Sequence, residues 1–368
     1  MSKINELVQL GQSIWYDYIR RSFLVSGDMQ GLIDKGLRGV TSNPSIFDKA
    51  ITDSTDYDAQ IRDLSEQDKP VEEIYESLAL EDIAIAAEML GAVYNETNGK
   101  DGYVSLEVSP ELAHNTTQTI AEAKRLFEAV GRPNIMIKVP ATAAGIPAIT
   151  ALIGSGVNVN VTLIFSIKNY KAVAAAYLSG LEELATGGPQ VNGGHGISTV
   201  ASVASFFVSR VDSAVDSELE KVGNKELQGK IAIANGKMAY LEFQNIFSGP
   251  RWENLLKKGA RVQRPLWAST GTKNPLYPDT LYVDHLIGPY TVNTVPPDTL
   301  KGFLDHGVVT PTLTKGLESA EANLKQLAGL DIHLDMIAEK LQDDGVTAFA
   351  KSFESLLAGI SEKRDRLR

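Results

Sequence analysis

The sequence predicts an α/β protein built on a closed (β/α)8 TIM-type barrel with additional C-terminal helices. Short runs of branched and aromatic residues alternate with longer amphipathic runs, the pattern of parallel strands joined by helical crossovers. The expected strands cover residues 14–19, 39–43, 103–108, 134–139, 158–165, 203–208, 262–269 and 290–295. Eight such strands favour closure into a barrel, and a doubly wound open sheet is the alternative.

Between the strands, apolar residues recur at helical spacing. A helix is expected over 110–130, where one stripe carries Ala113, Ile120, Ala123, Leu126 and Phe127. The Gly-Arg-Pro sequence at 131–133 ends this helix just before the next strand. Segments 145–153 and 170–184 supply the next two helices.

Beyond the eighth strand the pattern is helical. We expect 316–368 to pack on the barrel as an extension of a single domain, 1–368, because no linker rich in Pro, Gly or Ser marks a second domain. One apolar face of this tail carries Val346, Phe349, Ala350, Phe353, Leu357 and Ile360. Residues 363–368 are polar and are expected to fray. The pattern leaves open whether the tail covers one rim of the barrel or braces its side.

Composition excludes several kinds of chemistry. The chain has 46 acidic and 35 basic residues and a formal net charge of −11, so neither nucleic acid nor an anionic membrane is an expected partner. It has no cysteine, which excludes disulfides, zinc–thiolate sites and thiol catalysis. The five histidines lack metal-ligand spacing and no nucleotide-binding glycine motif occurs, so no metal or cofactor is expected.

The N-terminus indicates where the protein is located, and the segment 187–196 indicates a mobile region. The N-terminus lacks a signal-peptide pattern and no apolar run reaches transmembrane length, so a cytoplasmic protein is expected, either monomer or homodimer. The glycine-rich segment 187–196 follows a helical run instead of opening one. It is therefore expected to be a mobile loop and not a phosphate cradle.

Lys138 is the most informative residue. It lies in the apolar, branched run 134–140, which predicts an inward-pointing amine on a buried strand. Burial disfavours an ammonium ion, and a neutral amine can attack a carbonyl to form a Schiff base. The alternative is a lysine near a strand end that extends its ammonium group to water.

Other polar residues also fall near the ends of the predicted strands, where barrel proteins carry reactive groups. Each one has an ordinary alternative as a helix cap, a turn residue or a surface ion-pair partner. Together they would place two carboxylates, several hydroxyls and two cations on the rim that carries the buried amine. The candidates are Asp17, Asn43, Glu107, Asn160, Thr162, Ser205, Arg210, Ser269 and Lys273.

Three motifs resemble the transaldolase family, in its longer-chain type, and the resemblance covers nearly the whole chain. They are Gly-Val-Thr-Ser-Asn-Pro-Ser-Ile-Phe at 39–47, Asn-Ile-Met-Ile-Lys-Val-Pro at 134–140 and Asn-Val-Asn-Val-Thr-Leu-Ile-Phe at 158–165. The resemblance implies transfer of a dihydroxyacetone unit from sedoheptulose 7-phosphate or fructose 6-phosphate to an aldose phosphate. It places this reaction in the non-oxidative pentose phosphate pathway.

The resemblance also implies roles for individual residues. Lys138 would form the Schiff base, Asp17 would act as acid and base in C–C cleavage, and Glu107 with Thr162 would hold a water molecule. Asn43, Asn160 and Ser205 would bind the dihydroxyacetone moiety, and Arg210, Ser269 and Lys273 the phosphate. Lys273 departs from the family pattern, which has an arginine with the serine. It keeps the charge but loses the bidentate geometry.

Three other functions are considered. A fructose 6-phosphate aldolase would release free dihydroxyacetone, but Phe207 stands where those relatives carry a tyrosine, which favours the transferase. A retaining glycosidase would use Asp17 and Glu107 but would leave Lys138 without a purpose. A non-catalytic sugar-phosphate binder on the same fold would form no imine.

Overall fold

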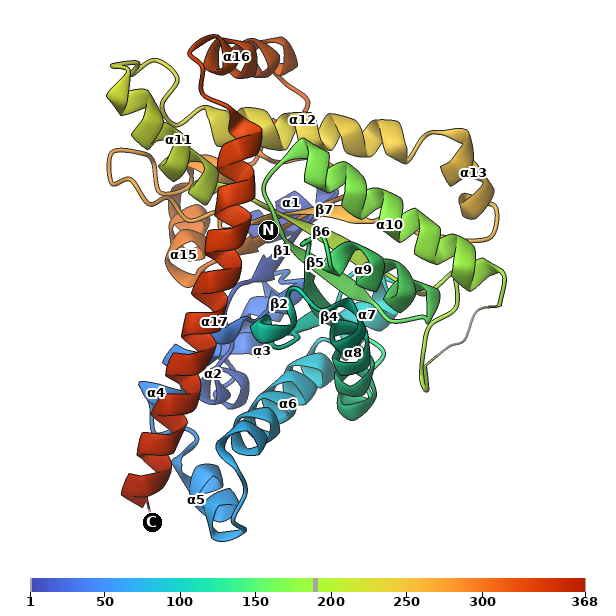
Figure 1. Ribbon diagram of the computed structural model, residues 1–368, viewed down its shortest axis with the longest axis vertical. Coiled ribbons are helices and arrows are strands. Elements are labelled where there is room, and N and C mark those ends of the chain that lie inside the picture. The colour runs from blue at the N-terminus through green and yellow to red at the C-terminus, as the bar shows by residue number, and fades with distance from the viewer. Residues whose placement is uncertain (1, 188–190, 368) are drawn as a thin grey trace.

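The protein is built around a closed parallel β-barrel (Figure 1). The computed structural model describes residues 2–187 and 191–367. Each strand pairs in parallel with the next, and β8 pairs with β1. The strands in the described residues are β1 (Gln12–Tyr16), β2 (Gly39–Thr41), β3 (Tyr103–Glu107), β4 (Ile135–Pro140), β5 (Val159–Ile164), β6 (Ser202–Phe207), β7 (Arg264–Ala268) and β8 (Thr291–Val295). The predicted barrel is confirmed and the open sheet is wrong.

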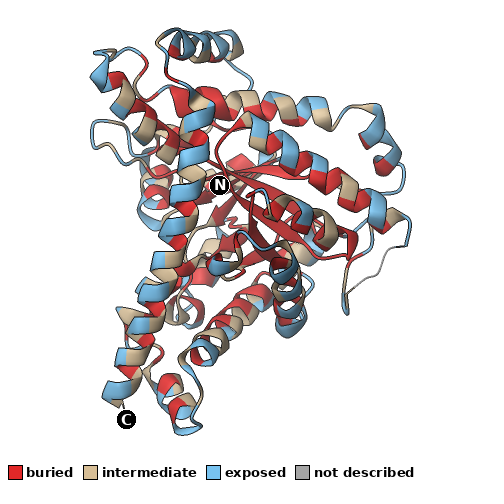
Figure 2. Cartoon of the chain, viewed as in Figure 1, coloured by how far each residue is buried: buried red, intermediate tan, exposed pale blue. Residues whose placement is uncertain are grey.

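The strands are buried on both faces, which explains why they appear in the sequence as short apolar runs. Every residue of β4, β5 and β6 is buried, and the barrel stands out as the buried centre of Figure 2. Helices cover the outward side chains, while inward side chains fill the barrel. A polar residue on such a strand, such as Lys138, therefore needs a partner.

Helices connect the strands and extend the C-terminus. Those in the first half are α1 (Lys3–Gln9), α2 (Arg21–Val25), α3 (Asp28–Asp34), α4 (Pro44–Thr52), α5 (Asp58–Glu66), α6 (Val71–Met89), α7 (Gly91–Glu96), the 3₁₀ helix η1 (Pro110–Leu112), α8 (Thr116–Val130), α9 (Gly145–Gly154) and α10 (Ile167–Ala185). Those that follow are α11 (Ser209–Lys221), α12 (Ile231–Ile246), α13 (Pro250–Leu256), α14 (Leu281–His285), α15 (Pro297–His306), α16 (Leu317–Gly329) and α17 (Leu334–Leu367).

The helix predicted over 110–130 begins later than expected. Pro110–Leu112 forms only the short η1, and α8 starts after Asn115, whose side chain accepts a hydrogen bond from the Gln118 backbone N–H at 3.0 Å. This side chain satisfies one of the free N–H groups of the first helical turn, which fixes the helix start. The helix ends as predicted at Gly131, which has a φ of 60°.

The C-terminal tail packs along the barrel. Helix α17 is the long red helix at the left of Figure 1 and contacts α4, α5, α6 and α11, while α16 packs on α12. Two details of the predicted tail are wrong. Leu356, not Leu357, is fully buried, and the chain does not fray at 363, because α17 continues to Leu367. Lys363 is buried and donates hydrogen bonds to Asp58 Oδ1, at 2.8 Å, and to the Ser54 carbonyl.

The glycine-rich segment lies partly outside the described residues, since 188–190 are not described. Its second half is held by hydrogen bonds. The His195 N–H donates to Gly156 O at 2.7 Å, and His195 Nε2 lies 2.9 Å from Pro133 O. Both carbonyls precede β4 and β5, so 191–196 lie near the amino ends of these strands.

The packing of β1 against β2 gives a test of the barrel. Gly39 pairs with Trp15, and a methyl group at Gly39 would lie 2.6 Å from Trp15 Cδ2. Because that indole is fully buried and cannot move away, Gly39→Ala should lower the free energy of unfolding by about 1–3 kcal/mol.

The matched control is Gly31→Ala in α3, where no described atom lies within 4 Å of the added methyl group. This change should stabilise by about 0.5–1 kcal/mol, since alanine loses less backbone entropy in a helix. Thermal unfolding of both variants measures the difference. Equal melting temperatures would contradict the packing described for β1 and β2.

Candidate active site

The predicted residues gather at the carboxyl ends of the strands. A cavity of about 390 Å³ opens there, and side chains from β4, β5, β6 and the segments after β1, β2, β6 and β7 line it. It has the position expected for the active site of a barrel enzyme. The predicted residues in its lining are Asp17, Asn43, Lys138, Thr162, Ser205, Phe207, Arg210, Ser269 and Lys273.

Lys138 lies at the floor of this cavity, on β4. Its side chain is buried, with Nζ 3.2 Å from Glu107 Oε2 and 3.3 Å from the Ser42 carbonyl oxygen, to which it donates. The ring centroid of Phe349 lies 5.6 Å from Nζ. The lysine therefore does not extend to bulk water, and the strand-end alternative is wrong for this residue.

Glu107 reaches Lys138 from the neighbouring strand. The two residues pair in register across β3 and β4. Glu107 does not line the main cavity but an adjoining one of about 230 Å³, beside Tyr75 and Phe353. Burial raises the pKa of Glu107, and the Lys138 ammonium group opposes this shift. The carboxyl group is thus able to accept a proton from the lysine.

Asp17 lies just beyond the end of β1. Its Oδ1 accepts a hydrogen bond from Thr41 Oγ1 at 2.7 Å, and the same hydroxyl lies 2.5 Å from Thr294 Oγ1. Burial raises the pKa of Asp17, while Lys138 and the hydrogen bond from Thr41 lower it. A carboxyl group with a raised pKa that faces the cavity can both take and return a proton.

The three residues expected to bind hydroxyl groups occupy different depths. Asn43 lines the cavity and also caps α4, since its Oδ1 accepts a hydrogen bond from the Ile46 N–H at 3.0 Å. Asn160 is fully buried and lies below the lining. It accepts from Ser205 Oγ at 2.6 Å and donates to Ser105 Oγ at 2.9 Å. Asn160 is therefore placed to orient the Ser205 hydroxyl.

Thr162 presents a hydroxyl group to the cavity. It is fully buried, and among the described residues its Oγ1 has no hydrogen-bond partner. A buried hydroxyl without a partner is costly, so a ligand or water in the cavity would stabilise it. This fits the predicted role of Thr162 beside Glu107.

A bulge follows Thr162 and is held by the tail. Leu163 has a φ of 59°, and the register between β5 and β6 shifts between Val161 and Ile164. Gln342 on α17 donates Nε2 hydrogen bonds to the Leu163 carbonyl at 2.9 Å and to the Ala141 carbonyl at 3.0 Å. Since a left-handed backbone is unfavourable for leucine, these contacts help to fix the bulged end of β5, which carries Thr162.

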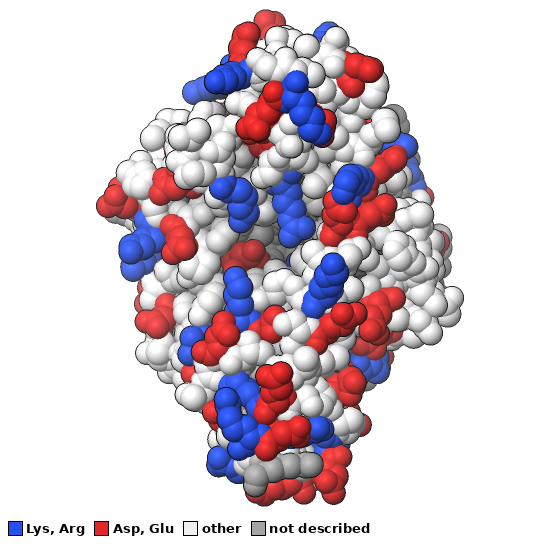
Figure 3. Space-filling view, turned by 60° about the vertical axis from the view of Figure 1, so that its left-hand side comes forward, with Lys and Arg blue, Asp and Glu red and all other residues white. Residues whose placement is uncertain are grey.

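The mouth of the cavity is basic. Arg210 is half-buried, with Cζ 5.3 Å from the Phe207 ring centroid and 6.0 Å from that of Phe349. Lys273 is exposed, and so is Lys49 on α4, which also lines the cavity. Within the described residues no carboxylate lies within 4.0 Å of these cations. Figure 3 shows basic side chains bordering a hollow on one face of the molecule.

Ser269 lies between this basic mouth and the strands. Its Oγ is 3.0 Å from Ser209 Oγ, and its φ is 57°, a conformation that turns the chain sharply after β7. The backbone carbonyl of Ser269 accepts from the Ser209 N–H at 3.0 Å, which fixes the turn. The predicted phosphate-binding residues thus lie on one side of the cavity.

Sequence reasoning missed several residues of this site. Lys49 lies two residues beyond the 39–47 motif, and this proximity was its only signal in the sequence. Phe349 was placed on the apolar face of the tail, but its position over Lys138 depends on how α17 crosses the barrel. Thr41 and Thr294 meet from β2 and β8, which are far apart in sequence.

A buried lysine paired with a carboxylate at the carboxyl ends of a (β/α)8 barrel defines a class of site suited to amine–carbonyl chemistry. The chain matches the model of the family Transaldolase/Fructose-6-phosphate aldolase over residues 14–360. Two curated relatives named Transaldolase support this match. The protein from Thermobifida fusca is 46% identical over 98% of each chain. The protein from Trichodesmium erythraeum is 45% identical over 98% of this chain and 97% of its own. The protein belongs to this family.

No helix in 2–187 or 191–367 combines the length and apolar character needed to cross a bilayer. The same residues contain no group of three or more His, Cys, Asp or Glu side chains arranged to hold a metal ion.

The raised pKa of Asp17 gives a stability test. Its folded-state pKa exceeds the ordinary value of 3.8, so its contribution to stability is full below about pH 4 and is lost as the pH rises through the folded-state pKa. Asp17→Asn removes this titration. The melting temperature of the variant, relative to that of the wild type at the same pH, should therefore be higher at about pH 8 than at about pH 4.

The control is Asp63→Asn, at an exposed position on α5. It should shift the melting temperature by the same small amount at each pH. If Asp17→Asn instead became less stable than wild type as the pH rose, the carboxylate of Asp17 would be a stabilising ion in the folded protein.

Proposed function

We propose that the protein is a transaldolase that moves a dihydroxyacetone unit from sedoheptulose 7-phosphate or fructose 6-phosphate to an aldose phosphate through a Schiff base on Lys138. The observation that carries the proposal is the buried Lys138–Glu107 pair at 3.2 Å, on the rim that also carries Asp17. The family and the names of the curated relatives support the reaction class. A cytoplasmic role in the non-oxidative pentose phosphate pathway belongs to the same proposal.

The first half-reaction forms an imine. Glu107 takes a proton from the Lys138 ammonium group, and the free amine adds to the C2 carbonyl of the ketose to give a carbinolamine. Protonation of the carbinolamine hydroxyl lets it leave as water and gives an iminium ion. Thr162 and Glu107 would hold the water that carries these protons, and the Thr162 hydroxyl, which has no partner among the described residues, supports this role.

Cleavage and transfer follow. Asp17 takes the proton of the C4 hydroxyl, which becomes the aldehyde of the departing aldose phosphate as the C3–C4 bond breaks. The electron pair of that bond forms the C2–C3 double bond of the enamine, and the iminium π electrons move to nitrogen. The enamine carbon then attacks the aldehyde of a second aldose phosphate, and Asp17 returns its proton to the new hydroxyl. Hydrolysis of the iminium ion releases the product. No step requires a metal or cofactor.

The cavity would orient the substrate from both ends. Asn43 and Ser205, which line the cavity, would bind hydroxyls of the dihydroxyacetone moiety, and Asn160 would orient Ser205 through their hydrogen bond. Arg210, Ser269 and Lys273 would bind the phosphate, and we add Lys49 to this group. Phe207 packs against Phe165 at 5.0 Å between ring centroids and offers no hydroxyl to activate water. This favours transfer over release of free dihydroxyacetone.

The activity test uses purified protein with fructose 6-phosphate and erythrose 4-phosphate. Sedoheptulose 7-phosphate should form, and Lys138→Arg should lower turnover at least about 1,000-fold, because the guanidinium group keeps the charge but is not a nucleophile. The same mixture without erythrose 4-phosphate tests the aldolase alternative by measuring free dihydroxyacetone. Turnover by Lys138→Arg above about 1% of wild type would exclude the Schiff base at this residue.

The basic mouth predicts how affinity depends on each cation. Arg210→Ala should raise KM for fructose 6-phosphate about 10- to 100-fold, since it removes charge-assisted hydrogen bonds from a half-buried cation. Lys273→Ala should raise KM less than about fivefold, and the effect should shrink with salt, because Lys273 is exposed. The control is Lys225→Ala, which removes an exposed lysine beyond α11 and should leave KM unchanged. An unchanged KM for Arg210→Ala would contradict the phosphate assignment.

A further inference from the structure

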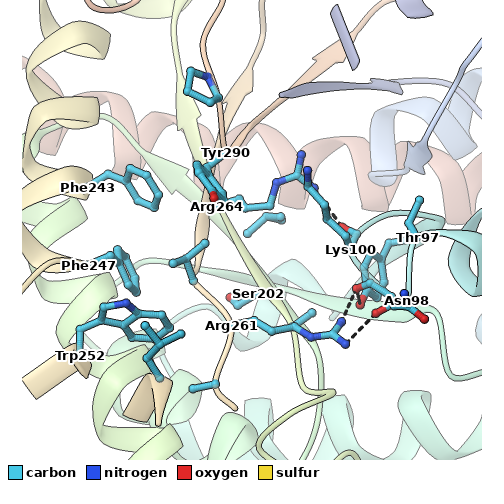
Figure 4. Close-up of a pocket in the computed structure, with 18 of the residues that line it drawn as sticks. Thr97, Asn98, Lys100, Ser202, Phe243, Phe247, Trp252, Arg261, Arg264 and Tyr290 are labelled. Atoms are coloured by element: carbon cyan, nitrogen blue, oxygen red, sulfur yellow. Dashed lines mark hydrogen bonds between the residues drawn. The ribbon is translucent and has the colours of Figure 1, made fainter. Parts of the chain in front are cut away.

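A second, larger cavity lies at the opposite end of the barrel. Its volume is about 700 Å³, within the range of small-molecule sites. Ser202 and Arg264, at the amino ends of β6 and β7, line it, and α12 and α13 form one side (Figure 4). None of the residues that we assign to catalysis or substrate binding contributes to its lining.

One wall of this cavity is aromatic. Tyr240 and Phe243 lie on α12, Phe247 directly follows that helix, and Trp252 adds an indole from α13. The ring centroids lie 5.6 Å apart for Tyr240 and Phe243, 5.2 Å for Phe243 and Phe247, and 5.0 Å for Phe247 and Trp252. Figure 4 shows Phe243, Phe247 and Trp252 along the same side of the cavity. Such a wall suits a flat apolar group.

The facing wall is cationic. Lys100, Arg261 and Arg264 line the cavity, and none of its described lining residues is Asp or Glu. Arg264 is neutralised by Asp101, which lies outside the lining and 2.8 Å from Arg264 Nη1. In the described part of the chain, the Arg261 guanidinium donates only to the Asn98 and Gly99 carbonyls, at 2.7 and 2.5 Å. Among the described residues no carboxylate lies within 4.0 Å of Lys100. This acid-free surface contrasts with the net charge of −11.

The mouth of the cavity is shaped by a strained residue. Tyr290 has a φ of 59°, keeps 55% of its surface exposed, and lies with its ring centroid 6.0 Å from Lys100 Nζ. A left-handed backbone at an aromatic residue persists only where the surroundings fix it, and such residues gather at ligand clamps. Burial, and then repulsion by Arg264, lower the pKa of Lys100, while the Asp101 carboxylate opposes this shift. An anion in the cavity would offset both effects.

We propose that this cavity binds an organic anion with a flat aromatic body. Its carboxylate, sulfonate or phosphate group lies against Lys100 and Arg261, and its ring lies against Phe243, Phe247 and Trp252. Charge complementarity selects the anion, and the aromatic wall selects the ring over a sugar phosphate, which has no apolar face of this size. The proposal does not depend on the activity at Lys138, because the two cavities lie at opposite ends of the barrel.

The probe is 8-anilinonaphthalene-1-sulfonate, titrated into the full-length native protein at low salt. The expected result is saturable binding at a single site, with quenching of tryptophan fluorescence as the naphthalene ring approaches Trp252. Lys100→Glu should weaken binding at least about tenfold, because it replaces an attraction by a repulsion. Gln244→Trp, at an exposed position of α12 that lines the cavity, should fill the space and abolish binding.

Two variants serve as controls. Lys225→Glu makes the same charge change away from the cavity, and Arg210→Ala alters the other cavity; both should bind as wild type does. Equal binding by all variants, or loss only with Arg210→Ala, would overturn the proposal, provided that melting temperatures show each variant folded. Light scattering measures the oligomeric state and so tests whether a second copy of the chain occupies the cavity. A wild-type dimer that Gln244→Trp converts to a monomer would assign the cavity to that second copy and overturn the proposal.

Discussion

The contact between Lys138 and Glu107 is the interaction on which the rest of the site depends. The two side chains come from neighbouring strands in register and meet 3.2 Å apart in a place from which water is largely removed. Such a pair is costly to bury, and breaking it by removing one partner leaves an uncompensated charge. Transfer of a proton from the Lys138 ammonium group to the Glu107 carboxylate neutralises both groups. This transfer would give the neutral amine that the proposed chemistry needs.

The barrel alone does not complete this arrangement. Phe349 of α17 covers Lys138 and packs near Arg210, and Gln342 of the same helix holds the bulge that follows Thr162. The helix is fixed at its far end by Lys363, which is buried against Asp58 and the Ser54 carbonyl. The C-terminal extension is thus part of the site and does not merely brace the barrel.

The sequence was sufficient for the barrel and for most of the site. All eight strands could be predicted because burial on both faces gives each a short apolar run. The rule that reactive groups follow strand ends brought eight polar candidates into one cavity. It was insufficient where long-range packing decides. Asn160 lies below the lining because it bonds Ser205 and Ser105, and Leu356 replaces Leu357 because the rotation of α17 is set by α4 and α5. Residues 363–368 are expected to fray from their polar composition, because the Asp58 partner of Lys363 lies 305 residues away in sequence.

The most direct measurement of the central claim is intact mass after incubation with fructose 6-phosphate and borohydride, followed by peptide mapping. Reduction of the enamine–iminium intermediate should leave one dihydroxyacetone-derived adduct, located on Lys138. An adduct on another lysine would move the nucleophile away from the Glu107 pair. A folded protein with no adduct would contradict covalent catalysis at this site.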